Sequence, residues 1–126
     1  MIGNKVVLDS NILILASKQE LDISKLLSSY EKFYVSIVTY IEVLGYKNMS
    51  NEEINIIKMF FNNIEIIDVD FEIAKIVITY KTQVIKKIKL PDAIILATAK
   101  HLGGVLLTRN TVDFTNIDEK VKIENI

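Results

Sequence analysis

The fold is decided by residues 5–11, which read KVVLDSN. A short run rich in β-branched side chains is typical of a buried strand, and the three polar residues that follow are typical of a helix N-terminus. The apolar run at residues 12–16 then continues the chain as a helix. A strand that leads directly into a capped helix begins a βαβ unit, so this stretch predicts a parallel sheet with Asp9 at the end of one strand.

The same alternation of strand and helix patterns continues along the chain. Further strands are predicted at residues 33–35, 64–67, 105–107 and, at the sheet edge, 121–123. Helices are predicted at residues 24–30, 36–45, 50–61, 73–84 and 90–102. The helix at 73–84 is expected to be the longest, and the one at 90–102 is apolar nearly all round and therefore central. We predict one doubly wound α/β domain over residues 1–126, with a mostly parallel sheet of four or five strands.

The composition excludes several classes of protein. The chain has 126 residues, enough for one domain with an ordinary core, and 16 acidic residues balance its 15 basic ones. A basic coat for sequence-independent nucleic-acid binding would need a surplus of Lys and Arg. Cysteine is absent, so any metal must be held by oxygen ligands or by His101, the single histidine. We expect a cytoplasmic protein, because the sequence has neither a signal-peptide pattern nor an apolar run long enough to span a membrane.

Four acidic residues fall near the carboxyl ends of the predicted strands. Asp9 ends the first strand, and Glu42 lies one turn into the helix after the second. Asp92 opens the central helix, and Asp113 lies in the predicted loop after the fourth strand. Ligands of doubly wound sheets bind at this edge, and converging carboxylates repel one another unless a cation neutralises them. Oxygen ligands favour Mg²⁺ or Mn²⁺, which suits the hydrolysis of a phosphate ester.

Each acid also has a purely structural interpretation. Asp9 or Asp92 would place a carboxylate at a helix N-terminus, as a cap. Thr39 and Glu42 have the spacing of a capping box, and Asp113 would close an Asx turn. The occurrence of all four acids near one edge, beside apolar neighbours, favours the metal site.

Four sequence signatures that contain these acids occur in a fixed order. They are VLDSN at 7–11, SxxTxxEVL at 36–44, LPDAxxxA at 90–97 and LTRNxxDF at 107–114. Together they resemble the successive signatures of the PIN domain, and in particular those of the VapC-like toxin ribonucleases of prokaryotic toxin–antitoxin pairs. The resemblance implies an α/β/α sandwich and a metal-dependent endoribonuclease that leaves 5′-phosphate and 3′-hydroxyl ends.

The resemblance also implies a role for each matching residue. Asp9, Glu42 and Asp92 match the three core metal-binding acids, and Asp113 matches a fourth, more variable acid. All four are thus expected to be catalytic and to bind Mg²⁺, with Mn²⁺ as a substitute. Asn11 and Thr108 match polar positions that help orient water or phosphate, and Asn110, a further supporting position, matches with Arg109 a common but less constrained stretch.

A basic run, Lys86-Lys87-Ile88-Lys89, comes just before Asp92. One interpretation is a clamp on RNA phosphates beside the acidic site, to which Arg109 would add a further contact. The other is a solvated helix end, where lysines complement the helix dipole.

The leading hypothesis is therefore a toxin that cleaves RNA and has a cognate antitoxin protein as its partner. The family's tendency to dimerise implies a homodimer. Two alternatives remain open: a PIN nuclease that processes RNA without a toxin role, and a catalytically weak PIN scaffold that binds proteins. Some apolar residues belong either to the core or to a dimer or antitoxin surface: Ile12, Leu13, Leu15, Phe60 and Phe61.

Overall fold

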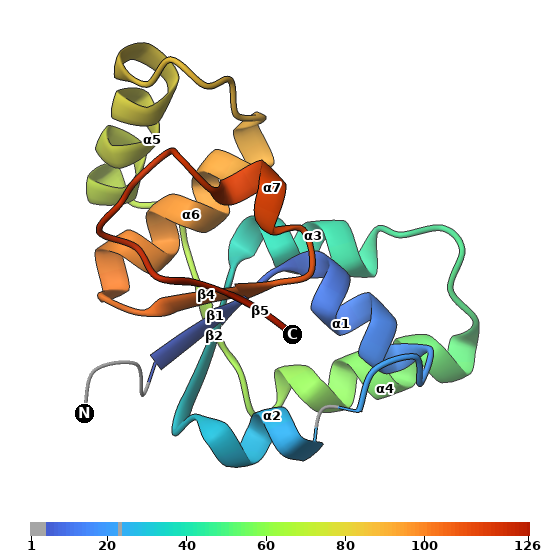
Figure 1. The fold of residues 1–126 in the computed structure, drawn as a ribbon. Helices are drawn as coiled ribbons and strands as arrows, with labels where there is room; N and C mark the ends of the chain where they lie inside the picture. The colour runs from blue at the N-terminus through green and yellow to red at the C-terminus, as the bar shows by residue number, and fades with distance from the viewer. Residues whose placement is uncertain (1–4, 23) are drawn as a thin grey trace.

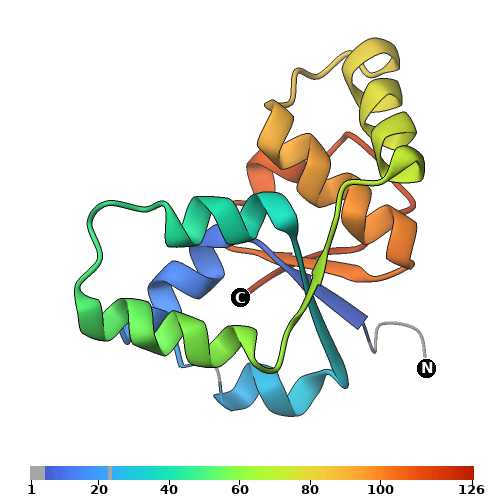
Figure 2. The same cartoon turned by 180° about the vertical axis from the view of Figure 1, so that it is seen from behind.

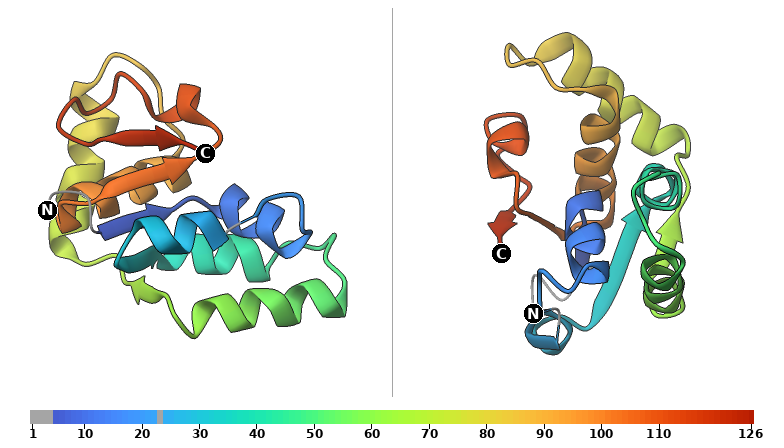
Figure 3. Two further views of the ribbon diagram at one scale, coloured as in Figure 1. Left: turned by 60° about the horizontal axis from the view of Figure 1, so that its bottom comes forward. Right: turned by 90° about the vertical axis from the view of Figure 1, so that its right-hand side faces the viewer.

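A computed structural model describes residues 5–22 and 24–126 of the chain. Its centre is a five-stranded sheet in the order β3-β2-β1-β4-β5, in which every pairing is parallel. The arrows of β1, β4 and β5 point the same way in the left view of Figure 3. The strands are β1 (Lys5–Leu8), β2 (Lys32–Ser36), β3 (Glu65–Ile67), β4 (Val105–Thr108) and β5 (Ile123–Asn125). The predicted parallel α/β fold is confirmed.

Helices connect consecutive strands, as the predicted βαβ pattern requires. They are α1 (Ser10–Ser17), α2 (Ser24–Ser29), α3 (Ile37–Leu44), α4 (Asn51–Phe61), α5 (Phe71–Gln83), α6 (Leu90–Leu102) and α7 (Thr111–Phe114). Side chains cap most of the long helices: Asp9 caps α1, Ser36 caps α3, and Ser50 forms a capping box with Glu53 at the start of α4. Gly103 ends α6 with a φ of 65°, a left-handed conformation that favours glycine.

Two hydrophobic cores lie on opposite faces of the sheet, because successive strand residues point to opposite sides. In β1, Val7 belongs to one core, whereas Val6 and Leu8 belong to the other. The Val7 side is covered by α5 and α6, and the Val6 side by α1 and α4. In Figure 1 the first pair of helices lies at the upper left and the second at the lower right, with the strands between them. The molecule is therefore an α/β/α sandwich.

The helices pack as their sequences predict. The central position of α6 is confirmed, since residues 95–99 are buried and the helix contacts α5, α3, β1 and β2. On the other face α1 packs against both α3 and α4, between which it lies in Figure 2. Ile12 and Leu13 belong to this core, whereas Leu15, Phe60 and Phe61 are half-buried at its margin.

Four local predictions are wrong. Asp113 lies in the short helix α7 rather than in a loop. Thr39 and Glu42 do not form a capping box, because α3 begins two residues before Thr39, whose buried hydroxyl has no hydrogen-bond partner within the described residues. The last strand lies at 123–125, where Ile123 pairs with Leu106, rather than at 121–123. Finally, α5 is not the single longest helix, because α6 has the same 13 residues.

A helix that crosses a membrane must be both long and apolar. Within residues 5–22 and 24–126, no helix combines the length and the apolar character that a bilayer span requires.

Candidate functional site

The site lies where the strand order reverses. From β1 the chain proceeds to β2 on one side, and later returns to place β4 on the other side of β1. The register pairs Leu8 with Leu107, and the Asp9 amide donates to the Leu107 carbonyl at 3.1 Å. Asp9 therefore stands beside Thr108 at the carboxyl edge of the sheet, where ligands of such folds bind.

The Asp9 carboxylate is fixed by two hydrogen bonds. Its Oδ1 accepts from the Ser10 amide at 2.7 Å, and its Oδ2 accepts from the Thr108 hydroxyl at 2.8 Å. Asp9 is 6% exposed and Thr108 is fully buried, so neither bond competes with bulk water. The structural interpretation of Asp9 as a helix cap is thus correct, and it does not exclude a role at the site.

A chain of hydrogen bonds links Asp9 to Asp113. The Thr108 hydroxyl, which donates to Asp9, also accepts from the Asn110 amide at 2.9 Å. The Asn110 side-chain amide in turn donates to Asp113 Oδ2. The supporting positions Thr108 and Asn110 thus connect the first acid to the fourth.

Glu42 reaches the site through a residue that the sequence did not single out. It lies in the second turn of α3, and its Oε1 accepts a 2.6 Å hydrogen bond from the Ser10 hydroxyl. Ser10 therefore holds Asp9 with its backbone and Glu42 with its side chain. The one sequence signal for this role of Ser10 is its position directly after Asp9, the acid that ends the strand.

Asp92 lies half-buried in the first turn of α6, close to the other acids. Burial, followed by repulsion from Asp9, Asp113 and Glu42, raises the pKa of Asp92 to about 6, against a smaller opposing effect of Lys89. Burial also raises the pKa of Asp9, and Glu42 and Asp113 add to this, while the hydrogen bonds from Thr108 and Ser10 act in the opposite direction. The charges of Glu42 and Asp113 thus lie close enough to Asp9 and Asp92 to act on the protonation of those two groups.

The donor atoms at this edge fit a hard cation. All four candidate ligands are carboxylates, the donors that Mg²⁺ and Mn²⁺ prefer. Within residues 5–22 and 24–126, however, no three acidic or histidine side chains are arranged closely enough to hold a metal. Like charges repel, and Glu42 is engaged with Ser10 instead. The residues are the right ones for a cation site, in an arrangement that a bound cation would have to tighten.

The remaining predicted residues lie around these acids. Asn11 and Arg109 are exposed and, with Asn110, line a shallow pocket that Ile14 and Leu15 complete. In the basic run, Lys87 and Lys89 are exposed. Lys86 is half-buried, and its ammonium group donates to backbone carbonyls of residues 112 and 115. The interpretation of this run as a solvated helix end is therefore wrong for Lys86.

Comparison with known proteins identifies the family. The sequence profile of the PIN domain family matches residues 6–120. No match is found among curated proteins.

Solved structures share the fold over nearly the whole length of both chains. One is VapBC2 from Rickettsia felis bound to a DNA fragment from its promoter (20% identity, TM-score 0.82, 97% of this chain and 98% of that chain). A second is DNA-bound VapBC from Salmonella typhimurium (21% identity, TM-score 0.80, 96% and 97%). A third is a toxin–antitoxin complex from Klebsiella pneumoniae (30% identity, TM-score 0.72, 92% and 94%). The chain therefore belongs to the PIN domain family, and it is similar to chains of VapBC-type toxin–antitoxin complexes.

Proposed function

We propose that this protein is a metal-dependent endoribonuclease, the toxin of a type II toxin–antitoxin pair. It hydrolyses RNA phosphodiester bonds in the cytoplasm and leaves 5′-phosphate and 3′-hydroxyl ends. Membership of the PIN domain family supports the nuclease activity, and the toxin–antitoxin complexes among its structural relatives support the toxin role.

One observation carries the proposal. Burial, together with repulsion from Asp9, Asp113 and Glu42, raises the pKa of Asp92, which supports a grouping of the four carboxylates near the point where the strand order reverses. Asp9 is buried and Asp92 half-buried, whereas Glu42 and Asp113 are exposed, and repulsion among like charges near buried carboxylates destabilises a fold. A divalent cation removes that repulsion, which is how a nuclease uses such a cluster.

The expected cation is Mg²⁺, with Mn²⁺ as a substitute, held by Asp9, Glu42 and Asp92, with Asp113 as a fourth or water-mediated ligand. When bound, such an ion polarises the phosphate and makes a water molecule more acidic. The hydrogen bonds from Thr108 and Ser10 keep the Asp9 carboxylate in a fixed orientation. Asp92 or Asp113 orients the attacking water through a carboxylate oxygen, so that attack on phosphorus is in line with the leaving 3′-oxygen.

Exposed cations near the acids hold the RNA backbone. Lys89 is close enough to Asp92 to lower its pKa, which places its ammonium group at the rim of the acidic cluster. Lys87 and Arg109 are exposed, and they precede Asp92 and Asp113, respectively, in the sequence. These three side chains are suited to neutralise phosphates that flank the scissile bond.

Two protein partners complete the proposal. One is a cognate antitoxin, which keeps the nuclease inactive, and the other is a second copy of this chain in a homodimer. The relatives from Rickettsia felis and Klebsiella pneumoniae are described as complexes of this toxin–antitoxin type.

The test is a cleavage assay on total RNA with protein purified away from its co-expressed antitoxin. Cleavage is expected with Mg²⁺, lost in EDTA, and restored by excess Mg²⁺. Asp9→Asn should reduce the rate by at least about a thousandfold, because it removes a charged ligand. The matched control is Asp68→Asn, a change at an exposed carboxylate just after the edge strand β3. Cleavage that persists in EDTA and in Asp9→Asn would disprove the proposal.

A further inference from the structure

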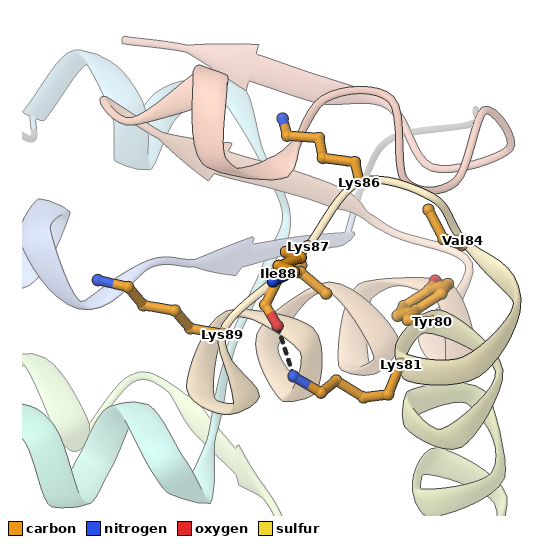
Figure 4. Close-up of a pocket in the computed structure, with 7 residues that line it drawn as sticks. All are labelled: Tyr80, Lys81, Val84, Lys86, Lys87, Ile88 and Lys89. Carbon is orange, nitrogen blue, oxygen red and sulfur yellow. Dashed lines mark hydrogen bonds between the residues drawn. The ribbon is translucent and has the colours of Figure 1, made fainter.

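Lys86 connects two segments that each carry an acid of the site. It lies between α5 and α6, six positions before Asp92. Its Nζ donates to the carbonyl of Val112 and, at 2.8 Å, to the carbonyl of Thr115. In Figure 4 its side chain extends from the connection between α5 and α6, and its Nζ contacts the segment that contains α7. The two acceptors lie on either side of Asp113 in the sequence.

The segment from which Lys86 extends is itself anchored. Lys81, in the last turn of α5, donates to the Ile88 carbonyl at 2.8 Å, the bond drawn in Figure 4. The Ile88 side chain is 5% exposed and belongs to the core under the sheet. Lys86 therefore extends from a fixed connection that continues directly into the first turn of α6, where Asp92 lies.

The helix that receives these bonds is too short to be stable alone. α7 has four residues, and the last carbonyls of any helix have no N–H donor within the helix. Phe114, which is 1% exposed, anchors its inner side in the core. Its outer side, with Asp113 and with Val112 at 73% exposed, has no such packing. The Lys86 ammonium group supplies a partner for two of the carbonyls on either side of Asp113.

We propose that Lys86 is a positioning residue, which holds α7 against the start of α6 and thereby keeps the Asp113 carboxylate beside Asp92. The inference rests on the proposed function for its consequence, since the purpose of this placement is to bring two acids together for a cation. It also divides the basic run by role: Lys86 binds the protein itself, whereas Lys87 and Lys89 remain available to RNA.

A positioning role and a purely electrostatic role of Lys86 predict opposite changes in cation affinity when Lys86 is replaced. Removing a nearby positive charge, with nothing else changed, strengthens the binding of a cation, because a repulsion is lost. Removing a group that positions a metal-binding side chain weakens the binding of the cation. Lys86→Met retains the aliphatic stem and should weaken Mn²⁺ binding by about tenfold. Lys87→Met removes the adjacent exposed charge and should leave the affinity unchanged or slightly higher.

A double-mutant cycle tests whether Lys86 acts through Asp113. Mn²⁺ affinity, measured by titration calorimetry without RNA, is compared in wild type, Lys86→Met, Asp113→Asn and the double variant. The Lys86 effect should disappear when Asp113 is already Asn, because residues that act together are not additive. An equal effect in both backgrounds, or tighter binding in Lys86→Met, would overturn the inference. Lys86→Arg, which keeps a charged donor, should restore part of the affinity.

Hydrogen exchange gives a second test that requires neither metal nor RNA. Amides of residues 111–116 should exchange faster in Lys86→Met than in wild type, while those of α6 remain unchanged. Unchanged exchange in α7 would overturn the inference even if the protein is a nuclease. If the wild-type protein binds no Mn²⁺ and cleaves no RNA, the proposed function fails, and the exchange data still decide whether Lys86 holds α7.

Discussion

Asp9 and Asp92 are two acids at the start of helices, and the protein treats them differently. Asp9 is nearly fully buried and receives hydrogen bonds from Thr108 and Ser10. Asp92 is half-buried and receives no hydrogen bond from the part of the chain that the structure describes. Burial and neighbouring carboxylates raise the pKa of both groups, but only at Asp9 do hydrogen bonds oppose the rise.

Under the proposed function, the difference corresponds to two ways of preparing a cation ligand. Hydrogen bonds give Asp9 a fixed direction before any cation arrives, and they favour its charged form. Asp92 is instead destabilised as a carboxylate, so a cation that binds there relieves repulsion that is already present. One acid supplies geometry and the other supplies a driving force for binding.

The largest expected effect tests whether the two acids are equally necessary. Asp92→Asn should reduce RNA cleavage by at least about a thousandfold, as Asp9→Asn does, because both remove a charged ligand. Single-turnover cleavage rates at saturating Mg²⁺ provide the measurement. An Asp92→Asn enzyme that retains a tenth of the activity would show that only the fixed acid matters.

A second prediction removes a hydrogen bond from the Asp9 carboxylate, which brings Asp9 closer to the state of Asp92. Thr108→Val removes the donor to Asp9 and the acceptor of the Asn110 amide, so it leaves two polar groups without their partner. We expect a loss of stability of about 1–3 kcal/mol and a decrease in cleavage of about 10- to 100-fold. Urea denaturation and cleavage rates measure the two effects. Thr98→Val is the control for activity, because Thr98 is an equally buried threonine of α6 whose hydroxyl donates to the Ile94 carbonyl of the same helix.

The pH dependence of metal binding tests whether the raised pKa of Asp92 affects the binding of a cation. The pKa of Asp92 is raised to about 6, so protons compete with the cation below that pH. Mn²⁺ affinity should be nearly constant above pH 6 and fall by up to about tenfold per pH unit below it. Calorimetric titrations across this range measure the change. In Asp92→Asn the decline near pH 6 should be absent.

The smallest effect concerns the stability of the metal-free protein. A carboxyl group with a raised pKa stabilises the fold below its unfolded pKa, here 3.8, and that stability is lost as pH rises through about 6. Asp92→Asn should therefore be more stable than wild type at neutral pH, by about 1–2 kcal/mol after allowance for partial solvent screening. The difference should vanish near pH 4 and reverse in saturating Mg²⁺. Thermal melts in EDTA and in Mg²⁺ would show either trend, and a wild type that is more stable in EDTA would refute the repulsion argument.

Much of this arrangement follows from local sequence signals. The strand at 5–8 and the capping residues after it have strong, short-range patterns, and the parallel edge then brings Asp9, Glu42 and Asp92 together. The contacts that refine the site are different in kind. Ser10 reaches Glu42 over 32 positions and Lys86 reaches Thr115 over 29, so both depend on how whole helices pack.

The wrong predictions have the same physical origin. α7 has only four residues, too few for a helical period to be visible, and it is held by Phe114 and Lys86 rather than by its own propensity. The last strand is shifted to 123–125 because its pairing with β4 sets the register. The helix α7 and the position of the last strand are determined by contacts with the rest of the fold, so a local sequence pattern does not predict them.

The hydrogen bond between Thr108 and Asp9 has a consequence for the synthesis of the protein, since it joins residues 99 positions apart. β1 lies in the middle of the sheet, yet one of its two neighbours, β4, is translated only near the end of the sequence. Pairings over such distances form late in folding. A nascent chain on the ribosome therefore carries Asp9 and Glu42 well before β4 is available to complete the sheet around them. The strand order therefore delays the assembly of the proposed nuclease site until β4 has been synthesised.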